Sequence, residues 1–339
     1  MQRTQPARGS ATARHLLIAG KIALSAGLIY YAFSKIDLAE AWLQIRSISS
    51  YAVIASAALL FLEMCIAAFR LRQILAMVGP RCGFVQVVDV VFIGAFFSQT
   101  LISFVGGDAM RIWRIVRSNV SLGLAAKGVV FDRMTGLAGL LTLILLTLPF
   151  LLDLVTDPAM RLGLLAALIA GVAGFVMLAL LKHLPASLKQ LKPFHWVADL
   201  AVVAISVARS KERLASLLGL SLLINVANVI ILYVIALGLS IELAFWHSLL
   251  LIPPVLFLAM LPISFAGWGV REGAMIVALG LVGVTPAQSV ALSVCFGLSV
   301  LAISLPGGFL WLLHRGQAAP AQGKLTGETA GSHARGPES

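Results

Sequence analysis

Residues 102–111 read Ile-Ser-Phe-Val-Gly-Gly-Asp-Ala-Met-Arg, and residues 263–272 read Ile-Ser-Phe-Ala-Gly-Trp-Gly-Val-Arg-Glu. Both stretches begin Ile-Ser-Phe-x-Gly and continue with a second glycine, an arginine and a nearby carboxylate. Each lies where an apolar segment meets ionisable residues. Glycine-broken apolar segments at matching places in two halves of a membrane protein are typical of a substrate site built from discontinuous helices. The pair therefore indicates both the kind of fold and the position of its site.

The composition around this pair indicates an integral membrane protein. Of 339 residues, 60% are hydrophobic and 12% are charged, and the mean hydropathy is +0.99; a soluble domain carries about 25% charged residues. We expect an all-α polytopic bundle of roughly eight spanning helices with re-entrant broken-helix segments, and the repeated motif is compatible with an inverted repeat. The apolar segments are 16–34, 51–69, 85–105, 134–152, 162–181, 215–238, 246–262, 272–284 and 287–313.

The two ends of the chain differ in composition from the apolar part. We expect a basic cytoplasmic tail over residues 1–15, a transmembrane domain over 16–314 and a disordered tail over 315–339. The apolar stretch after the basic tail is long for a signal peptide and has no clear cleavage site, so we interpret it as an uncleaved first helix.

Basic segments give an orientation for the chain. The N-terminal tail, residues 70–81 and residues 182–213 are all rich in Lys and Arg, which marks cytoplasmic segments. Simple alternation through every apolar segment would put the third of them outside. If 85–105 instead dips into the membrane and returns through 109–127, all three are cytoplasmic. We therefore predict a re-entrant turn at the first motif, with both termini in the cytoplasm.

Each copy of the motif contains the elements of an anion site. A helix that starts at Gly106-Gly107, or at Gly267-Trp268-Gly269, would present free backbone N–H groups at the positive end of its dipole. Arg111 and Arg271 lie close by, and a guanidinium binds two phosphate oxygens at once. The alternative is that the glycines form tight turns and the arginines reach the lipid headgroups at the interface.

Carboxylates accompany both arginines. Asp108 and Glu272 would pair with Arg111 and Arg271 when no ligand is bound. Asp132-Arg133 precedes segment 134–152 and is either an ion pair at a helix start or part of a cavity with the first motif.

Further polar side chains occur inside the apolar segments. Glu63 is a functional candidate because it is ionisable, although burial in neutral form or pairing across the bundle would equally account for it. Ser221, Asn225 and Asn228 follow helical spacing and predict hydrogen bonds between helices.

Several functional classes are not supported. The net charge of +11 does not indicate nucleic-acid binding, because the basic residues lie at segment ends and in loops. Cys65, Cys82 and Cys295 are isolated and suggest neither disulfides nor a metal site. The chain has no nucleotide-binding loop and no hydrolase or metalloprotease motif, so we expect neither a cofactor nor a catalytic centre.

A further set of short motifs resembles a known family. In chain order these are Phe69-Arg70-Leu71-Arg72, Phe92-Ile93-Gly94 with Gly-Gly-Asp-x-x-Arg, Asp132-Arg133 with Gly136-Leu137, Pro262-Ile263-Ser264-x-x-Gly-x-Gly-x-Arg-Glu and Pro306-Gly307-Gly308. Over residues 16–314 the chain resembles the flippase-like transmembrane domain of lysylphosphatidylglycerol synthases, which also occurs as stand-alone bacterial proteins. The chain departs from that pattern at Phe104-Val105, where the resemblance leads us to expect a proline.

The resemblance implies an inner-membrane protein that moves or handles a phospholipid-type substrate. In full-length synthases a cytosolic domain adds the aminoacyl group; this chain shows no such domain, so aminoacyl transfer is not expected. Stand-alone relatives are associated with hopanoid, glycolipid or polyprenyl-linked pathways, so the expected partner is an anionic membrane lipid of one of these kinds. The alternatives are a membrane-embedded glycosyl or phosphoryl transferase and a non-catalytic subunit of a lipid-synthesis complex.

Overall fold

The fold is entirely helical over the residues that the computed structural model describes. These are residues 42–43, 45–79, 81–100, 106–180, 192–260 and 269–315. Within them, ten helices and no strand are present, as the sequence predicts. The predicted first span, Gly267 and nearly all of both predicted tails lie outside the described residues; Arg315 is the last residue of the last described helix.

The described helices fall into long spans and shorter pieces. Five are long and apolar enough to cross a membrane: α3 (Ser50–Val78), α6 (Leu122–Leu154), α7 (Pro158–Leu180), α10 (Lys211–Gly238) and α13 (Pro286–Arg315). The others are α4 (Phe84–Thr100), α5 (Gly106–Val116), α9 (Lys192–Arg209), α11 (Phe245–Met260) and α12 (Val270–Gly280). The chain is therefore a multi-pass membrane protein with several helices too short to cross upright.

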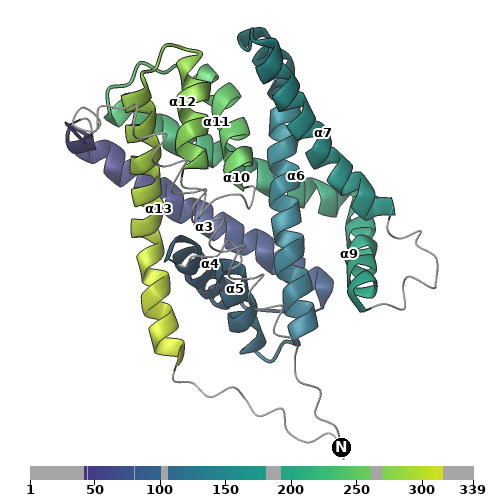
Figure 1. The fold of residues 1–339 in the computed structure, drawn as a ribbon. Coiled ribbons are helices and arrows are strands. Elements are labelled where there is room, and N and C mark those ends of the chain that lie inside the picture. The colour runs from purple at the N-terminus through teal and green to yellow at the C-terminus, as the bar shows by residue number, and fades with distance from the viewer. Residues whose placement is uncertain are drawn as a thin grey trace, which may run out of the picture.

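The centre of the fold is an antiparallel pair, α3 and α10. Helix α3 begins after Ser49, whose Oγ accepts from the N–H of Ala52 at 3.3 Å, and the N–H of Ser49 donates to the carbonyl of Gly238 at the end of α10. At the other end, Ser216 near the start of α10 donates to Gln73 near the end of α3. The two helices cross the middle of the molecule, with α6 and α13 standing on either side of them (Figure 1).

Helices α4 and α5 form a hairpin that enters from one end of the bundle and returns to it. Asp89 near the start of α4 and Arg114 near the end of α5 both contact His314, close to the last residue of α13. Farther along α4, Phe97 packs against Trp311. The start of α4 and the end of α5 thus lie at the same end of the molecule, as predicted for a re-entrant turn at the first motif.

A second hairpin, α11 and α12, enters from the opposite end. Trp246 at the start of α11 packs against Phe150 near the end of α6, and α12 leads directly into the start of α13. Figure 1 shows α11 and α12 on one side of the crossing α3–α10 pair and α4 and α5 on the other. Each hairpin ends near the middle of the bundle, at one copy of the repeated motif.

The two halves are related as an inverted repeat. Helix lengths correspond: 29 and 28 residues for α3 and α10, 17 and 16 for α4 and α11, and 11 each for α5 and α12. Contacts correspond too. If α3, α4, α5 and α6 correspond to α10, α11, α12 and α13, each contact in one half has a counterpart in the other. The contact α3–α4 corresponds to α10–α11, α4–α13 to α11–α6, and α5–α6 to α12–α13, and all of these pairs touch. Since the hairpins open at opposite ends, the relation inverts one half with respect to the membrane.

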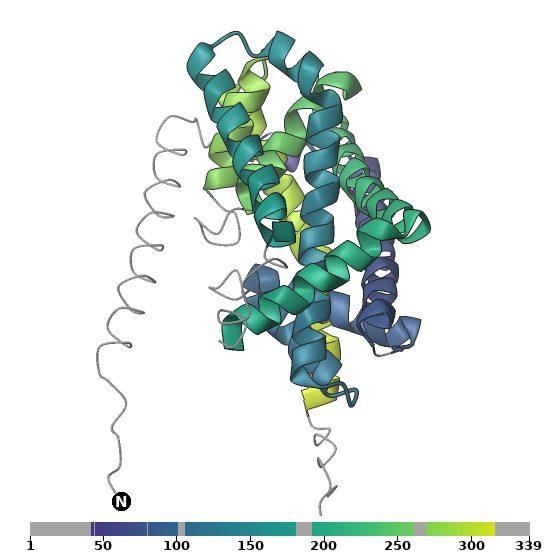
Figure 2. The same cartoon turned by 90° about the vertical axis from the view of Figure 1, so that its right-hand side faces the viewer.

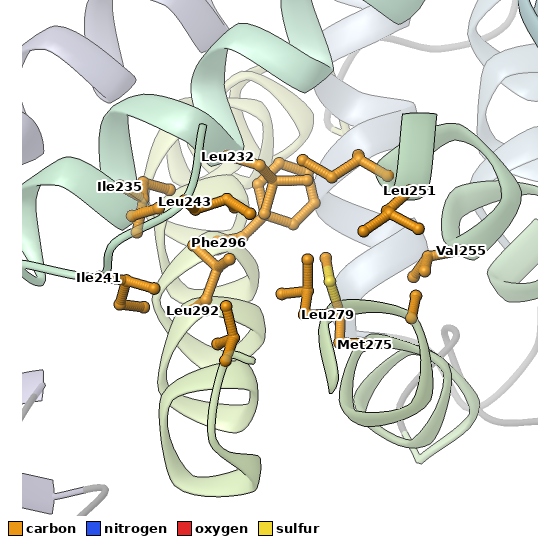
Figure 3. Close-up of a cluster of buried hydrophobic side chains, with 14 of the residues drawn as sticks. Leu232, Ile235, Ile241, Leu243, Leu251, Val255, Met275, Leu279, Leu292 and Phe296 are labelled. Atoms are coloured by element: carbon orange, nitrogen blue, oxygen red, sulfur yellow. The ribbon is translucent and has the colours of Figure 1, made fainter. Parts of the chain in front are cut away.

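A hydrophobic cluster fixes the second hairpin in the bundle. Leu232 and Ile235 of α10, Leu251 and Val255 of α11, Met275 and Leu279 of α12, and Leu292 and Phe296 of α13 contribute to it, and Figure 3 shows them pointing toward one another. Burial of a large apolar side chain contributes about 1.5–3 kcal/mol. Helices α7 and α9 lie outside this core and face the viewer in Figure 2.

Three sequence-based boundaries are wrong in detail. The return of the first hairpin ends at Val116 rather than near 127, because a turn follows and α6 already begins at Leu122. Asp132-Arg133 therefore lies well inside α6 and is not an ion pair at a helix start. Arg70 and Arg72, assigned to a basic loop, lie within α3, which continues to Val78.

Close approach of α13 to α4 depends on Gly307. A Cβ at this position would overlap the backbone carbonyl of Phe92 in α4, and backbone has no flexible end that can move aside. Pro306-Gly307-Gly308 lies inside a continuous helix, so the motif serves helix packing here.

We expect Gly307→Ala to destabilise the protein by about 1–3 kcal/mol through overpacking. Gly219→Ala in α10 is the matched control, because a Cβ there meets nothing within 4 Å; it should be neutral or stabilising by up to about 1 kcal/mol. Thermal unfolding in detergent measures both. Equal unfolding temperatures for the two variants would contradict the close approach of α13 to α4.

Candidate functional site

A polar cavity lies in the middle of the bundle, between the two hairpins. Its volume is about 380 Å³, and it is lined from α3, α4, α5, α6, α10, α11, α12 and α13. Ligand sites typically occupy about 300–1,000 Å³. Four arginines line it, Arg70, Arg111, Arg133 and Arg271, with the carboxylates of Glu63 and Asp132. Such a density of charge inside a membrane bundle makes the cavity the candidate functional site.

Asp132 of α6 joins two of these arginines. Its Oδ1 accepts from Nε of Arg70 at 2.9 Å, and its Oδ2 lies 3.5 Å from Nη1 of Arg111. The side chain is 4% exposed, and Arg70 is 8% exposed. Arg70 also donates to Ser221 Oγ of α10 at 3.0 Å. Asp132 thus links α3, α5 and α6 through two guanidinium groups.

Asp108, in the first turn of α5, binds the neighbouring arginine of α6. Nε of Arg133 lies 2.9 and 3.0 Å from the two carboxylate oxygens of Asp108. The expected partner, Arg111, is farther from Asp108, at 4.0 Å. The main ion pair of Asp108 therefore connects α5 to α6, and Arg111 lies between Asp108 and Asp132.

Helix α4 makes room for Arg111 at Gly94. A Cβ on Gly94 would overlap the Cγ, Nε and Cδ atoms of the Arg111 side chain. Nε of Arg111 is buried and has no hydrogen-bond partner among the described residues. The absence of a side chain at Gly94 lets Arg111 cross α4. The N–H at Nε of Arg111 has no acceptor among the described residues.

The second motif holds its arginine in a separate buried network. Nη2 of Arg271 lies 3.1 Å from Oε1 of Glu272, and its Nε donates to Ser293 Oγ at 2.8 Å. Ser293 in turn donates to Glu272 at 2.8 Å, and the guanidinium lies over the ring of Phe296, 5.5 Å from its centroid. Ser293 and Phe296 both lie on α13, the helix that follows the hairpin.

Glu272 also shapes the start of α12. The N–H of Gly269 donates to its Oε2, so this predicted free donor is already occupied. Gly269 has φ +86°, a left-handed conformation that favours glycine. Gly269 therefore serves the turn, and the cation that faces the cavity from this motif is Arg271.

Helix α10 supplies uncharged polar groups. Asn228 donates to Oε1 of Glu63 in α3 at 2.9 Å, and both side chains line the cavity. Asn225 lines it too and donates to the carbonyl of Ser221 in its own helix. The predicted hydrogen bonds between helices are thus confirmed for Ser221 and Asn228.

Each of the four arginines at the cavity has a carboxylate partner. Four guanidinium groups face it, with Glu63 and Asp132, while Asp108 and Glu272 pair with Arg133 and Arg271 without lining it. An unpaired buried charge is strongly unfavourable, so these carboxylate partners stabilise the arginines inside the bundle. An entering anion would meet arginine donors first and would compete with the carboxylates for them.

The structure brings together most of the residues that the sequence nominated. Arg111, Arg271, Asp132, Arg133 and Glu63 line one cavity, and Asp108 and Glu272 contact its arginines. Gly106 and Gly107 are buried at the start of α5, Gly269 lines a neighbouring apolar groove, and Gly267 lies outside the described residues.

Arg70 was missed as a site residue. The signal was present, because Arg70 follows Glu63 by seven residues and so shares its helix face. Arg70 was nevertheless assigned to a basic loop after the apolar run and was not nominated as a site residue.

We expect Asp132→Asn to destabilise the protein by about 3–5 kcal/mol, because it leaves two buried arginines without their shared carboxylate. The matched control, Asp153→Asn, alters an exposed carboxylate near the end of α6 and should stay within about 0.5 kcal/mol of wild type. Denaturant unfolding in mixed micelles compares them. Similar stabilities would show that the Arg70–Asp132–Arg111 group does not hold the helices together.

The fold and cavity agree with a comparison against known families. The family model described as lysylphosphatidylglycerol synthase TM region matches residues 18–307, which include both hairpins and every described cavity residue. A search of curated proteins finds no match. The match covers most of the chain, and the membrane-lipid role of the family fits a multi-pass protein with this cavity. The chain therefore belongs to the family of the lysylphosphatidylglycerol synthase transmembrane region.

Proposed function

We propose that this protein binds the phosphate-bearing headgroup of an anionic lipid in the central cavity and carries it across the bilayer. The observation that carries the proposal is the convergence of arginines from both re-entrant hairpins, Arg111 and Arg271, on one cavity. Arginine matches phosphate geometry and keeps its charge in an apolar environment. No such set of cations is needed to pack helices together, because small and apolar residues do that in membranes.

Carboxylate exchange would allow the headgroup to enter and leave. Asp132 and Glu272 occupy arginine donors at the cavity. A phosphate that arrives takes over some of these donors, and on release the carboxylates return to them. Nearly balanced exchange keeps the lipid from being trapped, which transport requires.

The inverted repeat supplies a route for access from both sides. Two hairpins of matching length reach the same cavity from opposite ends of the bundle. In inverted-repeat transporters, rocking of one half against the other exposes a fixed central site alternately to each side. We propose the same here, downhill or coupled to protons through a cavity carboxylate, since no nucleotide-binding motif is present in the chain.

The charge distribution supports an orientation with the α4–α5 end in the cytoplasm. Basic side chains near that end include Arg72, Arg81, Arg117, Lys211 and Arg213. The opposite end, where α6 meets α7 and α10 meets α11, carries Asp153, Asp157 and Glu242 and two arginines, Arg46 before α3 and Arg161, which is bonded to carbonyls of the α6 end. The excess of basic residues favours the first end as the inner one in a bacterial inner membrane.

Catalysis remains the alternative function. A transferase would use Asp108 or Glu272 as a base. In the structure both carboxylates are held in ion pairs, with Arg133 and Arg271 respectively. This arrangement favours a binding role for them, and we propose that the protein is not an enzyme.

Transport of fluorescent phosphatidylglycerol in liposomes tests the proposal. We expect Arg271→Gln to slow it about 10- to 100-fold, since a hydrogen bond to a charged group contributes about 1.5–3 kcal/mol. Arg213→Gln, at an exposed arginine of α10, is the matched control and should transport normally. Arg271→Lys keeps the charge but loses the planar fork and should fall in between.

A further variant separates transport from folding. Arg271→Gln combined with Glu272→Gln removes both charges of the buried pair, so it should unfold closer to wild type than Arg271→Gln alone and still fail to transport. Wild-type rates in the folded double variant would refute the proposal. Conversion of the lipid, seen by mass spectrometry without movement of its headgroup, would support the enzyme instead.

A further inference from the structure

A second cavity lies beside the central one and has the opposite chemistry. It is a groove of about 550 Å³ between α6 and α7 on one side and α11 and α12 on the other. Every described residue that lines it is apolar or glycine, and none of these carries a charged or hydroxyl side chain. Helix α7, which forms one wall, is the least buried of the five spans. Apolar cavities of this kind hold apolar ligands rather than water.

The groove has the length of one leaflet. Its α12 wall runs from Gly269 to Leu281, a rise of about 18 Å at 1.5 Å per residue. The hydrocarbon core of a bilayer is about 30 Å thick, so one leaflet accounts for about 15 Å. One end of the groove lies at the end of the bundle where α12 leads into α13, and the other lies at the start of α12, beside the central cavity.

Two glycines of the groove wall face open space. Gly163 of α7 and Gly273 of α12 both line it, and a Cβ at either position would meet nothing within 4 Å. Neither glycine is therefore needed for close helix packing, in contrast to Gly307. The groove therefore has room for an apolar ligand beside both glycines.

The groove and the central cavity share a wall. Gly269 lines the groove and Arg271, two residues later in the same hairpin, lines the cavity. On α11, Leu256 faces the cavity while Val255 and Phe257 face the groove. A lipid whose phosphate lies at Arg271 thus has the groove directly beside it.

We propose that this groove holds one acyl chain of the same anionic lipid whose phosphate occupies the central cavity. This inference rests on the proposed headgroup site and extends it, because it defines the substrate as a lipid recognised by both its head and its tail. A chain held in the groove would keep the apolar part of the lipid out of the polar cavity while the headgroup moves.

Photo-crosslinking tests the placement of the chain. The full-length protein is reconstituted in phosphatidylglycerol vesicles with a trace of phosphatidylglycerol that carries a diazirine near the end of one acyl chain. We expect labelled peptides from α7 and α12. A phosphatidylcholine with the same chain should label them less, and Arg271→Gln should lower labelling by the anionic probe alone, because the headgroup anchors the chain. Equal labelling by both lipids, unchanged by Arg271→Gln, would identify the occupant as bulk bilayer lipid and overturn the inference.

Groove-filling variants give the second readout. Gly163→Leu and Gly273→Leu place a side chain into the groove, and we expect each to cut labelling and phosphatidylglycerol transport at least about tenfold. Gly174→Leu in α7 and Gly280→Leu in α12 are matched controls, since both positions also have open space but neither lines the groove. They should behave as wild type.

The outcomes separate this inference from the proposed function. Transport that depends on Arg271 but is unaffected by Gly163→Leu and Gly273→Leu would leave the headgroup site standing and remove the chain site. The opposite result is groove labelling that requires the anionic headgroup and Arg271, in a protein that transports no lipid. That result would support the acyl-chain site and refute translocation.

Discussion

Neutralisation of arginine charge inside the membrane is the constraint on which the rest of the structure depends. Asp132 lies between Arg70 and Arg111 and is almost fully buried. A charge at this depth is tolerated only with a partner, so α3, α5 and α6 must meet where they do. Arg271, Glu272 and Ser293 impose the same condition on α12 and α13. These two networks hold the ends of the hairpins at the cavity, and the apolar clusters pack around them.

Much of the architecture could be predicted from the sequence, because bilayer physics leaves few alternatives. Apolar length identified the spans, and the basic segments required the first motif to turn back within the membrane. The repetition of Ile-Ser-Phe-x-Gly indicated two halves, and the matching helix lengths and contacts confirm an inverted repeat. The start of α6 was harder to predict. The helix begins at Leu122, well before the apolar run expected from residue 134, so Asp132 and Arg133 were placed at a boundary that they do not occupy.

The site was predictable in its residues but not in its pairings. Ionisable side chains inside apolar segments are rare, so Arg111, Arg271 and Glu63 could be identified as candidates from the sequence. Which carboxylate meets which arginine depends on the rotation and tilt of separate helices, and the sequence does not encode these locally. Asp108 therefore pairs with Arg133 rather than chiefly with Arg111, and the N–H of Gly269 is occupied by Glu272. The apolar groove could not be predicted, because its lining residues look like any lipid-facing surface.

A double-mutant cycle on lipid binding tests the central claim most directly, namely that Arg111 and Arg271 hold one headgroup together. Binding of fluorescent phosphatidylglycerol would be measured for wild type, Arg111→Gln, Arg271→Gln and the double variant. If both guanidinium groups bind the same phosphate, the two losses of free energy should differ from additivity by about 0.5–3 kcal/mol. Losses that add within about 0.5 kcal/mol would place the arginines at independent sites and contradict the account.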